Sequence, residues 1–194
     1  TGSFLMSDLR VINLAKTLVK YSIAAKPEMT VSVGATSAAE PLVLEVYEQL
    51  IIAGAFPVIS MVPPDINEIF FRKGKSHHFN KITNYQRSCA RASDATIRIM
   101  SETNTRALSF TDPHKQAMLA KASRPLSNVL LKKPWVLTLF PTHAYAQDAE
   151  MSLRRFEDFV YAATFSDEQS PVKCWKQIKR EQDRLISRLK GAQS

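Results

Sequence analysis

Short runs of apolar and β-branched residues recur along the chain, separated by longer segments with helical spacing of apolar residues. Apolar runs bounded by turn residues predict strands, here at residues 30–35, 57–61, 95–100 and 135–140. The fourth run has Thr138 as its sole polar residue, and Pro141 follows it. Such a run is typical of a strand buried on both faces, so we expect it in the middle of a parallel sheet.

Helical periodicity and helix-start residues predict helices around these strands, at residues 7–21, 40–53, 65–71, 80–92, 114–131, 152–165 and 171–189. Ser7 or Asp8 is expected to cap the first helix, and the fifth is expected to bend at Pro125. The polar and basic stretch at residues 72–79 is predicted to be a loop.

The last predicted helix carries an apolar stripe formed by Val172, Trp175, Ile178 and Leu185. A helix with many like charges gains little from propensity alone, so its apolar face must hold it in place. We therefore expect the stripe to pack back near the helix at residues 152–165, whose Phe156 and Phe159 need a cover.

The order of these elements predicts an α/β fold, as a three-layer domain with a mostly parallel sheet of four or more strands and a C-terminal helical extension. The first two strands form a βαβ unit with a right-handed crossover, and the first strand is expected to lie between the second and the third. Residues 7–150 would form the α/β domain and residues 151–194 the helical extension. Residues 1–6 are interpreted as a cloning remnant or a disordered start.

Composition narrows the function classes. The chain has 194 residues and a net charge of +8, spread along the sequence apart from a concentration after Lys173, so we favour a solvated basic surface over a nucleic-acid site. Five glycines leave little material for phosphate-cradling loops. The longest apolar region, residues 42–62, is interrupted by charged residues and does not make a membrane span. Two cysteines and the lack of a secretory signal predict a reduced, cytoplasmic protein.

The histidines do not form a recognisable metal motif. His77 and His78 are adjacent, and in an extended loop such residues point to opposite sides, so we interpret them as surface residues. His114 follows a helix-start proline and is expected in an exposed first turn. His143 follows the fourth strand, and we favour a helix-start role for it over a substrate contact.

Other candidate residues also favour structural roles. Thr142 is expected to cap the helix after the fourth strand, and the stretch Gly-Ala-Thr-Ser from Gly34 resembles half of a phosphate loop. Cys89 and Cys174 are interpreted as packing residues, and Trp175 as a core or docking anchor. We therefore assign no catalytic, cofactor-binding or metal-binding residue.

Four segments share residues with one known family: residues 15–33, residues 39–54, Pro-Thr-His-Ala-Tyr-Ala-Gln at 141–147, and Ser-Pro-Val-Lys-Cys-Trp at 170–175. The last two segments, with a Phe-x-x-Phe pair between them, are specific in combination, whereas each piece alone is a weak signal. From about residue 9 to residue 189 the chain resembles the N-terminal half of the thermophilic-type metalloaminopeptidases, the leucyl-aminopeptidase-like family of aminopeptidases T and S.

That resemblance implies part of a dinuclear-metal aminopeptidase that removes N-terminal residues from peptides. The family's metal ligands lie in its C-terminal half, so zinc, cobalt or manganese would bind only in a full-length protein. The implied role is an N-terminal non-catalytic domain, inactive alone, that shapes the active-site cavity and supports a missing C-terminal catalytic domain. The implied partners are that catalytic domain, peptide substrates and a second copy in a homodimer.

Two other function classes stay open. The +8 charge permits a stand-alone basic α/β module that binds an acidic ligand or nucleic acid. The chain could also be a purely structural dimerisation domain, with the last helix as the contact.

Overall fold

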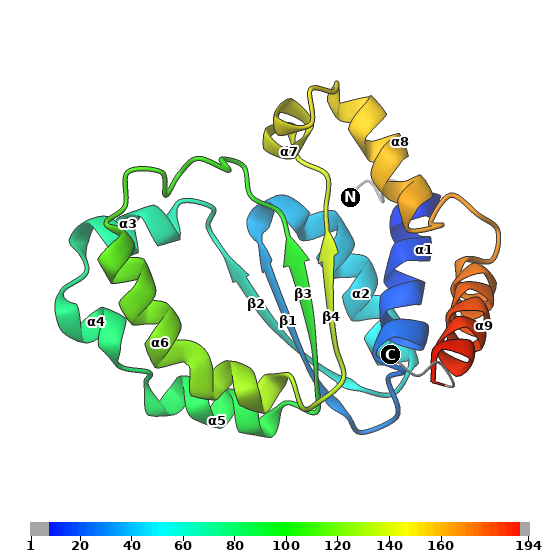
Figure 1. The fold of residues 1–194 in the computed structure, drawn as a ribbon, viewed down its shortest axis with the longest axis horizontal. Helices are drawn as coiled ribbons and strands as arrows, with labels where there is room; N and C mark the ends of the chain where they lie inside the picture. Colours follow the sequence, from blue (N-terminus) through cyan, green and yellow to red (C-terminus); the bar gives the residue numbers. More distant parts are fainter. Residues whose placement is uncertain (1–7, 191–194) are drawn as a thin grey trace, which may run out of the picture.

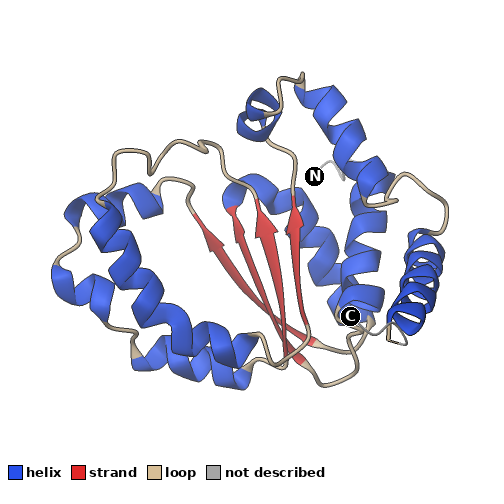
Figure 2. Cartoon of the chain, viewed as in Figure 1, coloured by secondary structure: helices blue, strands red, loops and turns tan. Residues whose placement is uncertain are grey.

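The computed structural model describes residues 8–190. The predicted start at residues 1–6, Ser7 as a cap and the last four residues of the helical extension lie outside this part. Four parallel strands form one sheet in the order β2-β1-β3-β4 (Figures 1 and 2). The α/β class, the parallel sheet and the central first strand are confirmed. The strands are β1 at Thr30–Thr36, β2 at Phe56–Val62, β3 at Ala95–Met100 and β4 at Trp135–Leu139.

One face of the sheet carries the main core. In β1 every second residue is buried, and Val31 and Val33 pair in register with Ala95 and Ile97 of β3. Two helices, α1 (Leu9–Thr17) and α2 (Glu40–Ile52), contribute buried residues to the same cluster. Asp8 caps α1 by accepting a hydrogen bond from the Arg10 N–H at 2.9 Å, as predicted. Residues Leu18–Ser22 continue α1 as a π-helix.

β4 lies at the edge of the sheet, so the prediction of a central strand buried on both faces is wrong. It pairs with β3, and its Trp135 and Leu137 side chains are 51% and 52% exposed. Val136, on the opposite face, packs against the main core. An apolar run indicates that at least one face of a strand is buried. It does not indicate whether the strand has one or two neighbours in the sheet.

A second group of helices lies on the other side of the sheet (Figure 1). It consists of α3 at Ile66–Lys73, α4 at Ser76–Asn80, α5 at Asn84–Ala92 and α6 at Pro113–Leu130. Residues 72–79, predicted as a loop, instead end α3 and form most of α4. Phe79, which is 1% exposed, packs against Phe70 and Phe71 with ring centroids 5.0 and 5.6 Å apart. This tertiary packing, rather than helical periodicity, explains the short helix.

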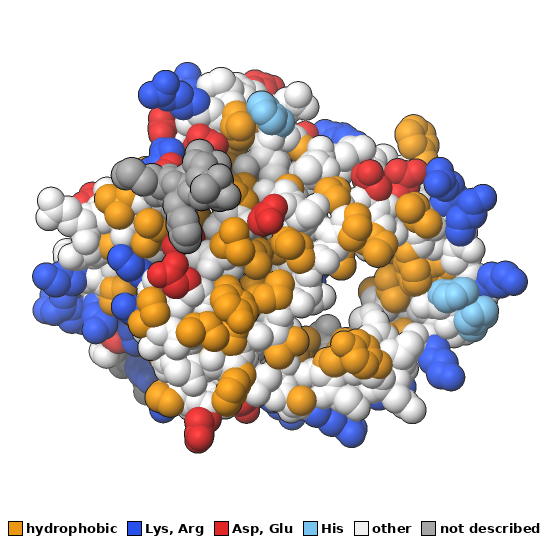
Figure 3. Space-filling view, turned by 180° about the vertical axis from the view of Figure 1, so that it is seen from behind, with side chains coloured by type: hydrophobic (Ala, Val, Ile, Leu, Met, Phe, Trp, Pro, Cys, Tyr) orange, Lys and Arg blue, Asp and Glu red, His pale blue; other side chains and the backbone are white. Residues whose placement is uncertain are grey.

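The second helical layer stands away from the middle of the sheet. No described residue of α6 is buried, and α6 contacts α4 and α5 instead. The space-filling view shows an opening through this part of the molecule (Figure 3). The three-layer arrangement is therefore present, but the two layers around the main core are packed much more closely than the third.

The C-terminal helices return to α1. They are α7 at His143–Asp148, α8 at Leu153–Ala163 and α9 at Pro171–Leu189. The buried Asn13 side chain of α1 donates to the Ser166 carbonyl at 3.0 Å, which joins the loop after α8 to α1. Within the described residues, no helix is both long enough and apolar enough to span a bilayer.

The predicted docking of the last helix is confirmed in its first half. The Trp175 ring lies edge-on to Phe165, with centroids 5.4 Å apart. The second half of the prediction is wrong, because Leu185 is 57% exposed and Phe159 remains 58% exposed. The apolar stripe continues beyond the surface of α1 and α8 that could cover it.

Candidate functional site

The carboxyl ends of β1, β3 and β4 meet at one edge of the sheet, where open α/β sheets place ligands. Thr36 ends β1, and the fully buried Ser101 directly follows β3. The Thr36 N–H donates to Ser101 Oγ at 3.1 Å, and the Thr36 hydroxyl donates to the Ser101 carbonyl at 2.7 Å. The two hydroxyl oxygens lie 2.8 Å apart. Because the single Thr36 hydroxyl proton is already used, the Ser101 hydroxyl is the donor between them.

Thr142 ties the third strand end to this network. Its hydroxyl donates to the Glu102 carbonyl at 2.6 Å and accepts from the Tyr145 N–H at 3.4 Å, which caps α7 as predicted. The Tyr145 hydroxyl accepts from the Glu102 N–H at 3.4 Å. The turn between β4 and α7 is thus held to Glu102, just after β3, by the side chains of Thr142 and Tyr145.

The chemistry available at this edge is limited. Three hydroxyls, those of Thr36, Ser101 and Thr142, are hydrogen-bonded to backbone groups. These hydrogen bonds have a structural role, because they link neighbouring segments. Exposed ionisable groups nearby include His143, at the first position of α7, and Glu102. Over residues 8–190, no three His, Cys, Asp or Glu side chains gather as a metal ion would require. The residues of this part of the chain therefore do not fit a dinuclear metal centre, and no catalytic step is derived from them.

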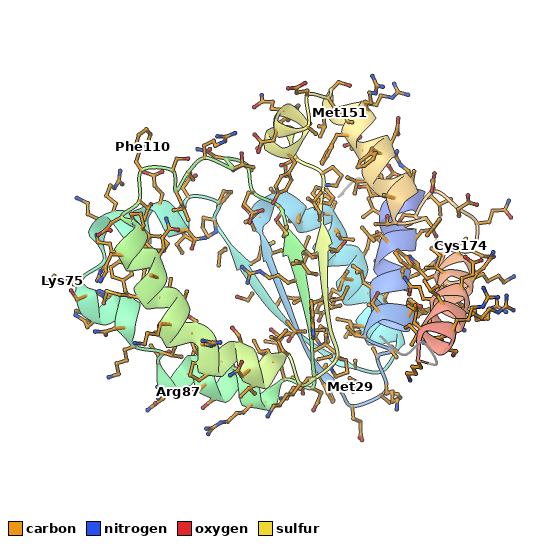
Figure 4. All side chains as sticks on the ribbon, viewed as in Figure 1. Met29, Lys75, Arg87, Phe110, Met151 and Cys174 are labelled. Atoms are coloured by element: carbon orange, nitrogen blue, oxygen red, sulfur yellow. The ribbon has the colours of Figure 1, made fainter. Side chains whose placement is uncertain are left out.

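His77 and His78 depart from the geometry that the sequence predicted. They lie in α4, not in an extended loop, and their rings are tilted together with centroids 4.0 Å apart. His78 Nδ1 accepts a hydrogen bond from the Lys75 N–H at 3.0 Å, which closes the first turn of α4 at the outer rim of the second helical layer (Figure 4). Both histidines are exposed, as expected, but the reason given for their separation was wrong.

The remaining histidine and the two cysteines are placed as follows. His114 lies exposed in the first turn of α6, as predicted. Cys89 is exposed on α5, so its interpretation as a packing residue is wrong, whereas Cys174 is half-buried. A hydrogen bond with Cys89 raises the pKa of the neighbouring exposed Tyr85. Helical position alone does not show which side of an amphipathic helix meets the core.

The half phosphate loop is not a phosphate site in the structure. Gly34 and Thr36 belong to β1 itself, and α2 begins with Glu40, whose carboxylate disfavours an anion at that helix terminus. A Cβ at Gly34 would lie 3.3 Å from Nη1 of Arg98. The glycine thus leaves room for the arginine that crosses the open face of the sheet.

Sequence reasoning missed two polar clusters because both join distant segments. Lys133 Nζ donates to the carbonyls of Ala90, Arg91 and Ser93 at the end of α5. Arg10 pairs with Asp8 at 2.7 Å and with Asp158 of α8 at 2.6 Å. The only one of these contacts between residues close in sequence is that of Asp8 with Arg10, so the sequence alone did not indicate the rest of either cluster.

Two groups at the second cluster have shifted pKa values, each for a different reason. A hydrogen bond from Arg10 lowers the pKa of Asp8. Burial in the main core raises the pKa of Tyr161 to about 12, although the Arg10 guanidinium, 4.7 Å from the ring centroid, acts in the opposite direction. Both groups belong to the contact between α1 and α8, away from the strand ends.

Comparison with solved structures shows the fold. Wild-type AmpT from Thermus thermophilus matches with a TM-score of 0.69 and 17% identity, over 89% of this chain and 46% of that chain. The chain therefore spans about half the length of that structure. A LacI-family transcription regulation repressor from Corynebacterium glutamicum matches with 13% identity over 68% of this chain and 41% of that one, but its TM-score of 0.33 carries no argument.

Comparison by sequence gives the family. No curated protein matches the chain. The family model described as thermophilic metalloprotease (M29) matches residues 7–194, which is nearly the whole chain. The resemblance to thermophilic-type metalloaminopeptidases is thereby confirmed, and the chain belongs to the M29 family of thermophilic metalloproteases.

Proposed function

We propose that this chain is the N-terminal, non-catalytic domain of a dinuclear-metal aminopeptidase that removes N-terminal residues from peptides. The observation that carries the proposal is the unequal coverage of the AmpT match, 89% of this chain against 46% of that chain. A domain of this size leaves about half of such a peptidase to supply the metal ligands. Zinc, cobalt or manganese would bind to that other half.

In this proposal, the residues of this chain give one side of the active-site cavity its shape and its rigidity. The Thr36–Ser101 and Thr142–Glu102 hydrogen bonds fix three strand ends against one another. A wall with fixed geometry excludes water and positions a substrate without contributing a reacting group. His143 and Glu102, which are exposed at this edge, are the residues we place against the catalytic half. The proposed compartment is the cytoplasm, supported by two free thiols, Cys89 and Cys174.

The first test uses the purified 194-residue chain after removal of metal by a chelator. With added zinc, cobalt or manganese we expect no hydrolysis of aminoacyl anilides and no stoichiometric metal uptake by titration calorimetry, because no described ligand cluster exists. Turnover that keeps a constant specific activity through purification, and is lost in a His77→Ala, His78→Ala double variant, would contradict the proposal.

The second test reads the complete reading frame around this chain. We expect it to encode a further segment in which Glu, His and Asp residues are clustered, and the whole protein to hydrolyse the anilides when metal is added. A complete protein that is inactive with all three metals would contradict the assignment to an aminopeptidase.

A second candidate function is a stand-alone module for an acidic ligand, favoured by exposed basic residues of α9. These are Lys173, Lys176, Lys179, Arg180, Arg184 and Arg188. Retention on heparin that falls steeply with salt, together with loss of retention when α9 residues are neutralised, would support this function over the first.

A further inference from the structure

A pocket lies between α5 and the second half of α6, at the end of the molecule where β3 and β4 begin (Figure 1). We call it the α5–α6 pocket. Its volume is about 160 Å³, and its lining is apolar except for Arg87 and Arg91. A cavity of about 150 Å³ holds a hydrocarbon the size of benzene, so this pocket has room for a branched aliphatic group of about six carbons.

The apolar lining comes from both helices. Ala90 of α5 and Ile82, which precedes that helix, are buried. The residues of α6 recur at the spacing of a single helical face, namely Ala122, Pro125, Leu126 and Val129. No described residue of α6 is buried, so α5 leaves this face partly uncovered. An aliphatic group in the pocket would remove this apolar surface from water, which is favourable.

The two arginines of the pocket lack acidic partners. Arg87 and Arg91 are one turn apart on α5, so they are neighbours on its surface. Within residues 8–190 neither forms an ion pair, and Arg87 donates only to the Asn84 side-chain oxygen, at 3.3 Å (Figure 4). Like charges at this spacing repel each other. A carboxylate between them would remove the repulsion and accept paired hydrogen bonds from a guanidinium group.

The charge around the pocket also favours an anion. Residues 72–133, which include α4, α5 and α6, contain 13 Lys and Arg against 3 Asp and Glu, a net charge of +10, whereas the rest of the chain carries −2. Carbonyls at the end of α5 accept hydrogen bonds from Lys133 Nζ, so the negative end of this helix is already compensated. The surrounding field therefore attracts an anion and opposes a cation.

We propose that the α5–α6 pocket binds a monocarboxylate that carries a short branched aliphatic group. The carboxylate lies on Arg87 and Arg91, and the aliphatic group lies against the apolar face of α6. A free amino acid does not fit, because its ammonium group would lie beside two guanidinium groups, and the described lining contains no carboxylate. The required chemistry occurs in a free branched-chain acid and at the carboxyl end of a peptide whose last residue is aliphatic.

This inference does not depend on the proposed peptidase function. The pocket lies where β3 and β4 begin, whereas the bonded hydroxyls of Thr36, Ser101 and Thr142 lie at the opposite edge, where the strands end. A ligand in the pocket would therefore not reach the edge that we place against a catalytic half.

The test is a titration of the isotope-labelled 194-residue chain, followed by heteronuclear NMR at constant ionic strength. Isocaproate should shift amide signals near Ala90 and Leu126 in a saturable way. Three related probes each lack one required feature and should bind at least ~10-fold more weakly. Acetate lacks the aliphatic group, N-acetyl-leucinamide lacks the carboxylate, and free leucine carries the unfavourable ammonium group.

Substitution of the arginines shows whether the binding is local. Arg87→Met and Arg91→Met keep an unbranched apolar side chain but remove the charge, and each should raise the dissociation constant for isocaproate at least ~10-fold. Both side chains are exposed, so the fold should be retained, which circular dichroism checks. Arg124→Met is the matched control, because Arg124 is an exposed arginine of α6 outside the pocket lining. It removes the same charge and should change the dissociation constant less than ~2-fold.

A fifth probe, N-acetyl-leucine, distinguishes the two sources of the ligand. Binding as tight as that of isocaproate supports the proposal and assigns the pocket to the carboxyl end of a peptide. Binding of isocaproate without N-acetyl-leucine supports it and assigns the pocket to a free acid. The proposal is overturned if isocaproate causes no saturable shifts, if N-acetyl-leucinamide or acetate binds equally well, or if Arg124→Met weakens binding as much as Arg87→Met and Arg91→Met. None of these outcomes changes the expected result of the peptidase assay.

Discussion

Replacement of Trp175 by alanine tests how α9 is attached. Trp175 Nε1 donates to the Thr164 carbonyl at 3.1 Å, and its ring lies edge-on to Phe165. The Tyr21 hydroxyl donates to the Trp175 carbonyl at 3.3 Å, which joins the same residue to the end of the first helix. Every described residue from Glu181 onward is exposed, so these contacts near the start of α9 hold the whole helix.

The expected loss follows from partial burial. Truncation of a fully buried tryptophan costs about 3–5 kcal/mol, and Trp175 is half-buried, so Trp175→Ala should lower the free energy of unfolding by about 2–3 kcal/mol. For a chain of this size that is a fall in melting temperature of roughly 5–10 °C. Trp175→Phe keeps an aromatic ring against Phe165 but removes the indole donor, and should cost about 1 kcal/mol.

Thermal unfolding monitored by far-UV circular dichroism, combined with hydrogen exchange, measures both effects. Amides near Trp175 should be protected in the unmutated chain and lose protection in Trp175→Ala, whereas those after Glu181 should exchange faster in both. Leu185→Ala is the control, because an exposed side chain should change stability by no more than about 0.5 kcal/mol. An unchanged melting temperature in Trp175→Ala, or a larger loss in Leu185→Ala, would refute this account of the docking.

Two further predictions concern buried groups. Because burial raises the pKa of Tyr161 to about 12, above its unfolded value near 10, the unfolded state loses this proton first and stability should fall between pH 10 and pH 12. Denaturant titrations should show a fall of roughly 2 kcal/mol over that range, reduced in Tyr161→Phe; equal slopes in both proteins would contradict the assignment. Ser101→Ala leaves the Thr36 N–H without its acceptor and should cost about 1–3 kcal/mol by the same titration, against no measurable change in the exposed control Ser109→Ala.

Elements with strong local signals were predictable. β1 was predictable as a strand from its β-branched residues, and Thr142 as a helix cap because its hydroxyl directly precedes α7. The position of β4 was not predictable from its composition, since an edge strand with one face on a core and another half exposed can be as apolar as a central one. Neighbour relations between strands are global properties that a local pattern does not contain.

At the candidate site, too, local contacts were predictable and long-range contacts were not. Thr142 was visible because its partner Tyr145 is three residues away, whereas Ser101 was missed because its partner Thr36 is 65 residues away. α4 was missed for a related reason, since its Phe79 is held by Phe70 and Phe71 of the preceding helix rather than by its own periodicity. Long-range hydrogen bonds and aromatic packing become predictable only when the strand order is known.

The hydrogen bonds at the strand ends indicate which role this edge of the sheet can have. The hydroxyls of Thr36, Ser101 and Thr142 each bond a backbone group of a neighbouring segment, and Ser101 is fully buried. If one of these hydroxyls acted as a nucleophile, its backbone partner would lose a hydrogen bond at a cost of about 1–3 kcal/mol. The same bonds make the edge stiff, which a wall around another domain's active site requires. The engagement of these three hydroxyls in bonds between segments therefore supports the structural role proposed for this edge.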